Sequence, residues 1–227
     1  MPKELQITNL SFVILARSHN PSLLNPDFLK VNNIIGNDWV TMSPTFSTEQ
    51  LSQVVFNNGI NLALQPDRLT INQDFEHKFD FKDVLLADIA SKFLETLPHV
   101  NYMALGINPT GHIIFETETE LNDFVLTKLL RDGDWKNFNG IQPEVAFSFS
   151  YSLEKKDIQV SINDVIVSNR ETKEKESGIL FSGNIHYDFT AELSLDQKLS
   201  FLRERLSLWK NDLDDYYSLV NNCFLKI

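Results

Sequence analysis

Apolar and polar residues alternate along three consecutive segments in the second half of the chain. Residues 145–153, 158–162 and 179–189 each place an apolar side chain at every second position. A period of two is typical of a strand that buries one face and exposes the other. Connections of turn or loop length join the three segments, so the pattern predicts an antiparallel meander.

A more continuous apolar run near the start of the chain predicts another kind of strand. Within residues 6–17, Phe12 and Ile14 fall on one face, and Val13 and Leu15 fall on the other. Apolar residues on both faces are typical of a strand that is covered on both sides. We therefore expect residues 6–17 to form a central strand.

Turn residues divide the other strand patterns of the first half. Asn58-Gly59 and Pro66-Asp67 interrupt the alternation over residues 54–73, which predicts strands joined by tight turns. Residues 100–107 predict another strand. Pro109-Thr110-Gly111 then predicts a turn into a short strand that ends at Phe115.

Three segments have the apolar spacing of amphipathic helices, namely residues 81–97, 118–132 and 195–224. Ser194 and Gln197 form a capping-box pattern before the last one. Its apolar residues alternate at spacings of four and three, which is compatible with a coiled coil as well as with a helix across a sheet. Further apolar positions widen the stripe and favour packing across a sheet. Cys223 lies on the stripe and is expected to be buried.

These elements together predict an α+β fold in which a mostly antiparallel sheet packs against helices, one of them a long C-terminal helix. We expect residues 1–227 to form a single α+β domain. Both halves, 1–116 and 117–227, run from strands to a helix, and Gly59-Ile60-Asn61 matches Gly106-Ile107-Asn108. These features raise the possibility of a pseudo-repeat.

Charge and composition narrow the possible partners. The formal net charge is −11, and no cluster of Lys and Arg occurs, so we expect neither nucleic acid nor a membrane surface as a partner. A single cysteine excludes a disulfide within the chain. No signal-peptide pattern is present, so we expect a cytoplasmic protein. The 17 Phe predict a thick apolar core or, alternatively, an apolar pocket.

No motif for catalysis, metal binding or cofactor binding is recognisable. The five histidines lack the close spacing of a ligand pair, and no phosphate-binding loop or nucleophile elbow occurs. Asp212, Asp214 and Asp215 are interpreted as a solvated acidic helix face. The sequence therefore favours a protein that is not an enzyme and has no metal or cofactor.

The polar face of the predicted meander is the candidate site. Its residues are short and mostly uncharged, unlike the Lys and Glu that usually cover a solvated sheet face, and we select Ser150, Asn184, His186 and Asp188 as a contact surface. A Ser-His-Asp nucleophile is disfavoured because neighbouring side chains on a strand point outward in parallel. A plainly solvated face is the alternative. A second copy of the chain is the first candidate partner and a basic protein the second.

Three short segments resemble an uncharacterised family of soluble bacterial proteins. They are residues 55–60 (Val-Phe-Asn-Asn-Gly-Ile), 102–108 (Tyr-Met-Ala-Leu-Gly-Ile-Asn) and 184–187 (Asn-Ile-His-Tyr). The resemblance implies no activity and transfers no residue role. Two hypotheses follow: a non-enzymatic protein-interaction or regulatory module, and a small-molecule binding protein or hydrolase with a cavity between sheet and helices. A cavity of roughly 300 Å³ or more with convergent polar groups would favour the second.

Overall fold

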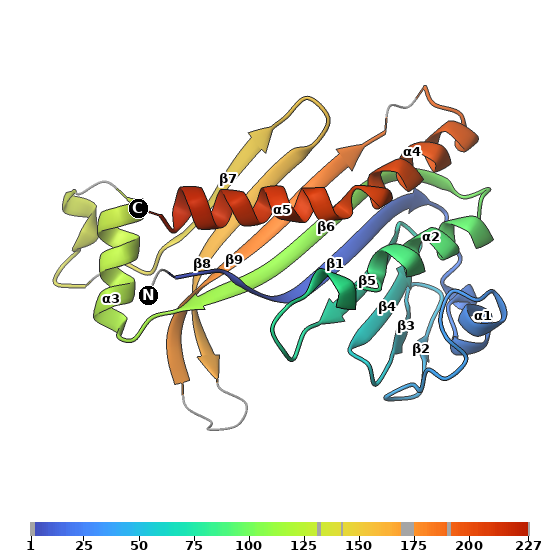
Figure 1. Ribbon diagram of the computed structural model, residues 1–227, viewed down its shortest axis with the longest axis horizontal. Helices are drawn as coiled ribbons and strands as arrows, with labels where there is room; N and C mark the ends of the chain where they lie inside the picture. The colour runs from blue at the N-terminus through green and yellow to red at the C-terminus, as the bar shows by residue number, and fades with distance from the viewer. Residues whose placement is uncertain (1–2, 131–132, 142, 169–174, 190–191, 227) are drawn as a thin grey trace.

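The computed structural model describes residues 3–130, 133–141, 143–168, 175–189 and 192–226. Its strands form one antiparallel nine-stranded sheet in the order β2-β3-β4-β5-β1-β6-β9-β8-β7 (Figure 1). The predicted α+β fold with an antiparallel sheet is confirmed. The strands are β1 (Gln6–Arg17), β2 (Phe46–Ser47), β3 (Ser52–Val55), β4 (Ile60–Gln65), β5 (Arg68–Asp74), β6 (Asn101–Ile114), β7 (Ala146–Ser152), β8 (Asp157–Ser168) and β9 (Lys175–Asp188).

Helices α2, α4 and α5 lie across one face of this sheet (Figure 1). Two predicted helices are less regular than expected, because a 3-10 turn precedes α2 and a π-helical segment follows α3. The helices are α1 (Pro26–Val31), α2 (Leu86–Thr96), α3 (Glu118–Asp123), α4 (Leu195–Ser207) and α5 (Trp209–Ser218). The shorter helical segments are η1 (Pro21–Leu23), η2 (Phe81–Asp83), η3 (Phe124–Leu129), η4 (Asp134–Lys136) and η5 (Leu219–Phe224).

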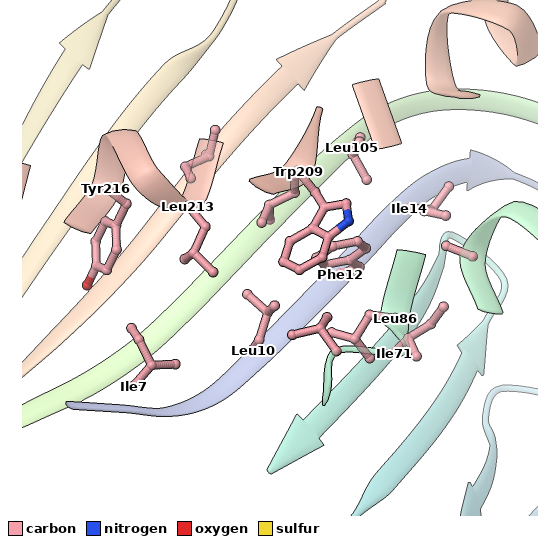
Figure 2. Packing of buried hydrophobic residues seen from close by; sticks show 14 of the residues in the cluster. Ile7, Leu10, Phe12, Ile14, Ile71, Leu86, Leu105, Trp209, Leu213 and Tyr216 are labelled. Atoms are coloured by element: carbon pink, nitrogen blue, oxygen red, sulfur yellow. The ribbon is translucent and has the colours of Figure 1, made fainter. Parts of the chain in front are cut away.

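The core lies between the helices and the centre of the sheet. The ring of Phe12 packs edge-to-face against Trp209, with centroids 6.3 Å apart. Figure 2 shows Leu10 and Leu213 beside this pair, and both are fully buried. Burying an apolar side chain of this size contributes about 1.5–3 kcal/mol. This packing holds the helical layer on one face of the sheet.

The strand β1 is central, as predicted. The prediction that both of its faces are covered is wrong. It lies between β5 and β6. Val13 and Leu15 alternate with the residues beneath the helices, and they are only half-buried. We call the sheet face to which they belong the open face.

The order of elements repeats along the chain. Strand, helix, three-strand meander and helix occur first as β1, α1, β3–β5 and α2, and again as β6, α3, β7–β9 and α4. Apart from the two-residue strand β2 at one edge, the sheet order is symmetric about the β1–β6 pair. This repeat divides the chain before β6, whereas the predicted halves divide it at residue 116 and stay a prediction. The two Gly-Ile-Asn sequences occupy different places in the repeat, since Gly59 precedes β4 and Gly106 lies within β6.

The predicted turn at Pro109-Thr110-Gly111 is wrong, because β6 continues through it. Antiparallel pairing with β1 and β9 extends on both sides of Pro109. The proline has no N–H to donate, and pairing with β9 is recorded at Ile107 and Thr110 but not at Pro109. Long pairing on both sides therefore overrides a local turn signal.

The C-terminal helix is divided rather than continuous, so that part of the fold prediction holds only in part. The capping box of Ser194 and Gln197 starts α4 as predicted, but Leu208 separates α4 from α5. Ser207 Oγ donates to Glu204 O at 2.7 Å, and such back-bonding bends helices. The last turn, η5, is π-helical, and there Phe224 is buried while Cys223 is exposed. The expected burial of Cys223 is wrong because the π-helical turn rotates the apolar stripe.

Candidate functional site on the open sheet face

A row of short polar side chains crosses seven strands of the open face. Each member is paired with the next one across neighbouring strands. The one exception is Asn184 and Asn108, which lie opposite each other because the pairs Ile107–Ile185 and Thr110–Ser182 flank them. Six spacings of about 4.8 Å give this row a length of about 29 Å. We call this set the first polar row: Ser150, Gln159, Asn184, Asn108, Ser11, Asn72 and Asn61.

A second polar row runs parallel to the first, about 7 Å away along the strands. Gln159 Nε2 donates to Ser148 Oγ at 2.9 Å, and the hydroxyls of Ser161 and Ser148 lie 3.2 Å apart. At the far end, Asn9 Nδ2 donates to Asp74 Oδ1 at 2.8 Å. The second polar row consists of Ser148, Ser161, Ser182, Thr110 and Asn9.

The four residues predicted from the sequence are all on this face. Ser150 and Asn184 belong to the first polar row and are separated by Gln159 of β8. His186 and Asp188 follow along β9, and Asp188 is exposed. Their side chains are in contact, with 2.9 Å between His186 Nε2 and Asp188 Oδ1. The expectation that such neighbours only point outward in parallel is therefore wrong for this pair.

The His186–Asp188 pair does not extend to a serine. Among the described side chains, Asp188 is the only hydrogen-bond partner of the His186 ring. A nucleophile relay would need a hydroxyl on the other ring nitrogen. The arrangement therefore gives no support to hydrolysis on this face.

Sequence reasoning missed the part of the site that the first half of the chain supplies. Asn61, Asn72, Ser11 and Asn108 each alternate with buried residues on their own strand, as the selected Asn184 does. The signal was present, but only the strand order brings these residues into line with Ser150 and Asn184. Asn108 Oδ1 is buried, and no hydrogen-bond partner is recorded for it.

The two polar rows carry no charged side chain. Charged residues of the open face lie beyond the ends of the rows or on flanking positions, as Asp74 and Asp188 do. Since the chain carries a formal charge of −11, a neutral strip across the middle of the sheet is a local departure from the rest of the composition.

The acidic helix face is not entirely solvated, as had been interpreted. Asp212 is 2% exposed; its Oδ1 accepts from Tyr187 Oη at 2.6 Å and from Lys156 Nζ at 2.7 Å. Lys156 Nζ also donates to Asp215 at 2.6 Å. Burial alone would lower the pKa of Lys156, but these two carboxylates raise it. The cluster attaches α5 to the strands and is a structural element.

A groove of about 1280 Å³ lies beside the N-terminal end of β1, and residues 3–9 and 74–81 make up most of its lining. Phe75, Phe79, Phe81 and Tyr217 contribute to its wall together with several charged side chains. It exceeds the volume set as a criterion for ligand binding, although it lies at the edge of the layer rather than in its middle. This observation keeps the ligand-binding hypothesis open.

Neither a metal-binding cluster nor a membrane-spanning helix occurs among the described residues. No group of three or more His, Cys, Asp or Glu side chains there is arranged to hold a metal ion. No helix within the same residues is long and apolar enough to cross a lipid bilayer.

The comparisons of the chain with known proteins found no match. No protein-family model matches the chain, and no curated protein is significantly similar to it in sequence. The faint resemblance noted in the sequence therefore gains no support, and function has to be argued from the open face and the groove.

Proposed function

We propose that this chain is a cytoplasmic, non-enzymatic interaction module whose open face binds a second copy of the same chain. The observation that carries the proposal is the pair of uncharged polar rows, which crosses the sheet from β7 to β4. Ser150, Asn184, His186 and Asp188 belong to this contact surface.

Charge favours a second copy over the other partners considered. Two chains of charge −11 repel one another through most surfaces, and a neutral strip lets them meet with the least repulsion. A basic protein would gain more from an acidic surface, and a nucleic acid would need a basic one. Asn, Gln and Ser both donate and accept hydrogen bonds, so the strip is complementary to itself.

Side-chain entropy also supports a contact role. Ordering a Lys or Glu side chain costs up to about 2 kcal/mol, whereas short polar side chains lose less freedom. The two polar rows bring no charge into the interface that would have to be desolvated, and the charged Asp188 lies on a flanking position. A face that only meets water gains nothing from avoiding Lys and Glu.

The test introduces two lysines into the first polar row and measures the mass in solution by sedimentation equilibrium. We expect the wild-type chain to sediment as a dimer and Ser150→Lys/Asn184→Lys as a monomer of 26.1 kDa, because two charges would be buried without partners. The matched control is Ser200→Lys/Asn211→Lys, at exposed positions of the helical layer, and it should remain a dimer. A folded face variant with unchanged mass would contradict the proposal.

The alternative function is that of a small-molecule binding protein, and the groove beside residues 3–9 is the observation that favours it. Its volume of about 1280 Å³ exceeds the roughly 300 Å³ that a small-ligand pocket needs. Recovery of a metabolite with the purified chain, in the absence of a dimer, would reverse the ranking of the two functions.

A further inference from the structure

The edge of β1 is only partly paired. Pairing with β5 runs from Asn9 to Leu15, whereas pairing with β6 already begins at Gln6. The last contact on the β5 side is the hydrogen bond from Phe75 N–H to Thr8 O, at 2.9 Å. Before Thr8, the strand pairing of β1 within the described chain is with β6, and the Leu5 N–H donates to Asn221 Oδ1 at 2.9 Å; residues 3–9 line the groove. Unpaired strand edges are templates for an added strand.

The shape of the groove fits an extended segment. Two runs of consecutive residues, 3–9 and 74–81, make up most of its lining, and the end of β6 with Glu116, the end of β8 and Tyr217 complete it. A strand of six residues is about 20 Å long, which matches the length of the first run. A compact metabolite would leave much of the 1280 Å³ empty, since small-ligand pockets occupy about 300–1,000 Å³.

The two sides of the groove differ in polarity with the period of a strand. Leu5 and Ile7 are buried on the helical side, where Phe79 and Tyr217 contact one another with ring centroids 6.2 Å apart. Glu4 and Gln6 alternate with them and are exposed. An added strand would therefore present apolar side chains to one side and polar side chains to the other.

The charged lining selects the polar side chains of the occupant. Five carboxylates and two lysines contribute to it; of these groups, Lys3 already pairs with Glu120 at 3.1 Å and Asp80 pairs with Lys82 at 2.9 Å, so negative charge remains in excess. The excess of negative charge favours a cation. The carboxylates are Glu4, Asp74, Glu76, Asp80 and Glu116.

We infer that this groove binds an extended peptide of about six residues, with alternating apolar and basic side chains, which adds to the edge of β1 as a further strand. The occupant is a segment of another protein that is basic, unlike this acidic chain. This inference goes beyond the proposed dimer, because the groove lies beside the N-terminal end of β1 and shares only Asn9 with the polar rows.

The test uses an acetylated, amidated and fluorescently labelled Val-Lys-Val-Lys-Val-Lys peptide, with binding measured by fluorescence anisotropy. We expect it to bind at least tenfold more tightly than two matched probes. One replaces Lys by Glu, and the other carries N-methyl groups on alternate peptide bonds, which removes the donors that strand addition needs. Equal binding of the N-methylated probe would contradict strand addition, and equal binding of the Glu probe would contradict selection by charge.

Variants locate the binding on the molecule. Glu4→Lys/Glu116→Lys, in the groove wall, should weaken binding of the Val-Lys peptide at least tenfold. Glu49→Lys/Glu192→Lys has the same charge change at exposed positions outside the groove lining and should weaken it less than threefold. Ser150→Lys/Asn184→Lys should bind as the wild type does, which separates this result from the dimer proposal. Absence of binding to the wild-type chain, or equal losses in both glutamate variants, would overturn the inference.

Discussion

The two halves of the sheet show how one order of elements can be stabilised in two ways. On one side of the β1–β6 pair the strands are short, with six residues in β4 and seven in β5. On the other side two of the three strands are long, with 12 residues in β8 and 14 in β9, while β7 has seven. Both sides nevertheless continue the same polar row across the open face. The first polar row therefore depends on which residues face away from the helices, and not on the length of the strands.

The attachment of the helices differs more strongly between the halves. In the first half, Gln73 of β5 bridges the chain before α2, because its Nε2 donates to Asp83 O at 2.7 Å and its Oε1 accepts from Leu85 N–H at 3.0 Å. In the second half, Tyr187 of β9 and Lys156 hold Asp212 of α5. A neutral amide therefore attaches the helix of the first half to the sheet, and an ionic cluster attaches the helix of the second half.

The largest effect should come from the ionic cluster. Asp212→Leu leaves Lys156 and the Tyr187 hydroxyl without their buried acceptor, and removing one partner of a buried ion pair costs about 3–5 kcal/mol. Lys156 keeps Asp215, so we expect about 3 kcal/mol less free energy of unfolding, measured by urea denaturation. Asp214→Leu, at an exposed position of the same helix, should change it by less than about 0.5 kcal/mol. Equal effects of the two substitutions would show that the cluster does not attach the helix.

The neutral bridge should contribute less. Gln73→Leu removes the acceptor of one backbone N–H and the donor to one backbone carbonyl, and leaving buried polar groups unsatisfied costs about 1–3 kcal/mol. We expect about 2 kcal/mol, from the same denaturation measurement. Gln53→Leu, which removes a half-exposed amide that donates to Asn61, is the matched control and should cost less than about 1 kcal/mol. A larger loss for Gln73→Leu than for Asp212→Leu would reverse the comparison between the halves.

A smaller effect is expected from acid and concerns the first half. His19 is 6% exposed and packs against Phe93 and Tyr102. Burial lowers its pKa, and the carboxylate of Asp67 offsets this only in part. The unfolded chain therefore takes up a proton near pH 6.5 that the folded chain resists, so stability is lost as the pH falls from 6.5 towards the lower folded pKa.

This pH effect can be measured with a variant that keeps the packing. One proton contributes at most about 1.4 kcal/mol per pH unit, and we expect His19→Phe to reduce the loss of stability between pH 7.5 and 5.5 by about 1 kcal/mol. His112, whose pKa burial also lowers, should account for part of the remaining loss. An identical loss in wild type and His19→Phe would show that His19 does not resist protonation.

Local patterns were sufficient where the chain pairs with its own neighbours in sequence. The meander of β7, β8 and β9 and the capping box at Ser194 follow from alternation and from side-chain chemistry over a few residues. Local patterns gave wrong predictions where contacts with residues distant in the sequence determine the structure. Pro109 stays within a strand because β1 and β9 flank it, and Asp212 is buried because Lys156 and Tyr187 reach it from distant parts of the chain.

The candidate site shows the same division. Ser150 and Asn184 could be assigned to one face from the meander alone. Asn61 and Asn72 could not be placed beside them, because no local pattern specifies that β1 and β6 join the two halves at the centre of the sheet. The sequence did not identify Asn61 and Asn72 as part of the first polar row. Substitutions at these two residues therefore test the proposed contact surface independently of the sequence prediction.

The most direct measurement is the mass in solution of Asn61→Lys/Asn72→Lys, determined by sedimentation equilibrium beside Ser150→Lys/Asn184→Lys. If the polar row acts as one contact surface, lysines placed in either half should convert the wild-type dimer to a monomer of 26.1 kDa while circular dichroism remains unchanged. A wild-type chain that is monomeric at high concentration, or a dimer that persists when the lysines lie at Asn61 and Asn72, would contradict the account.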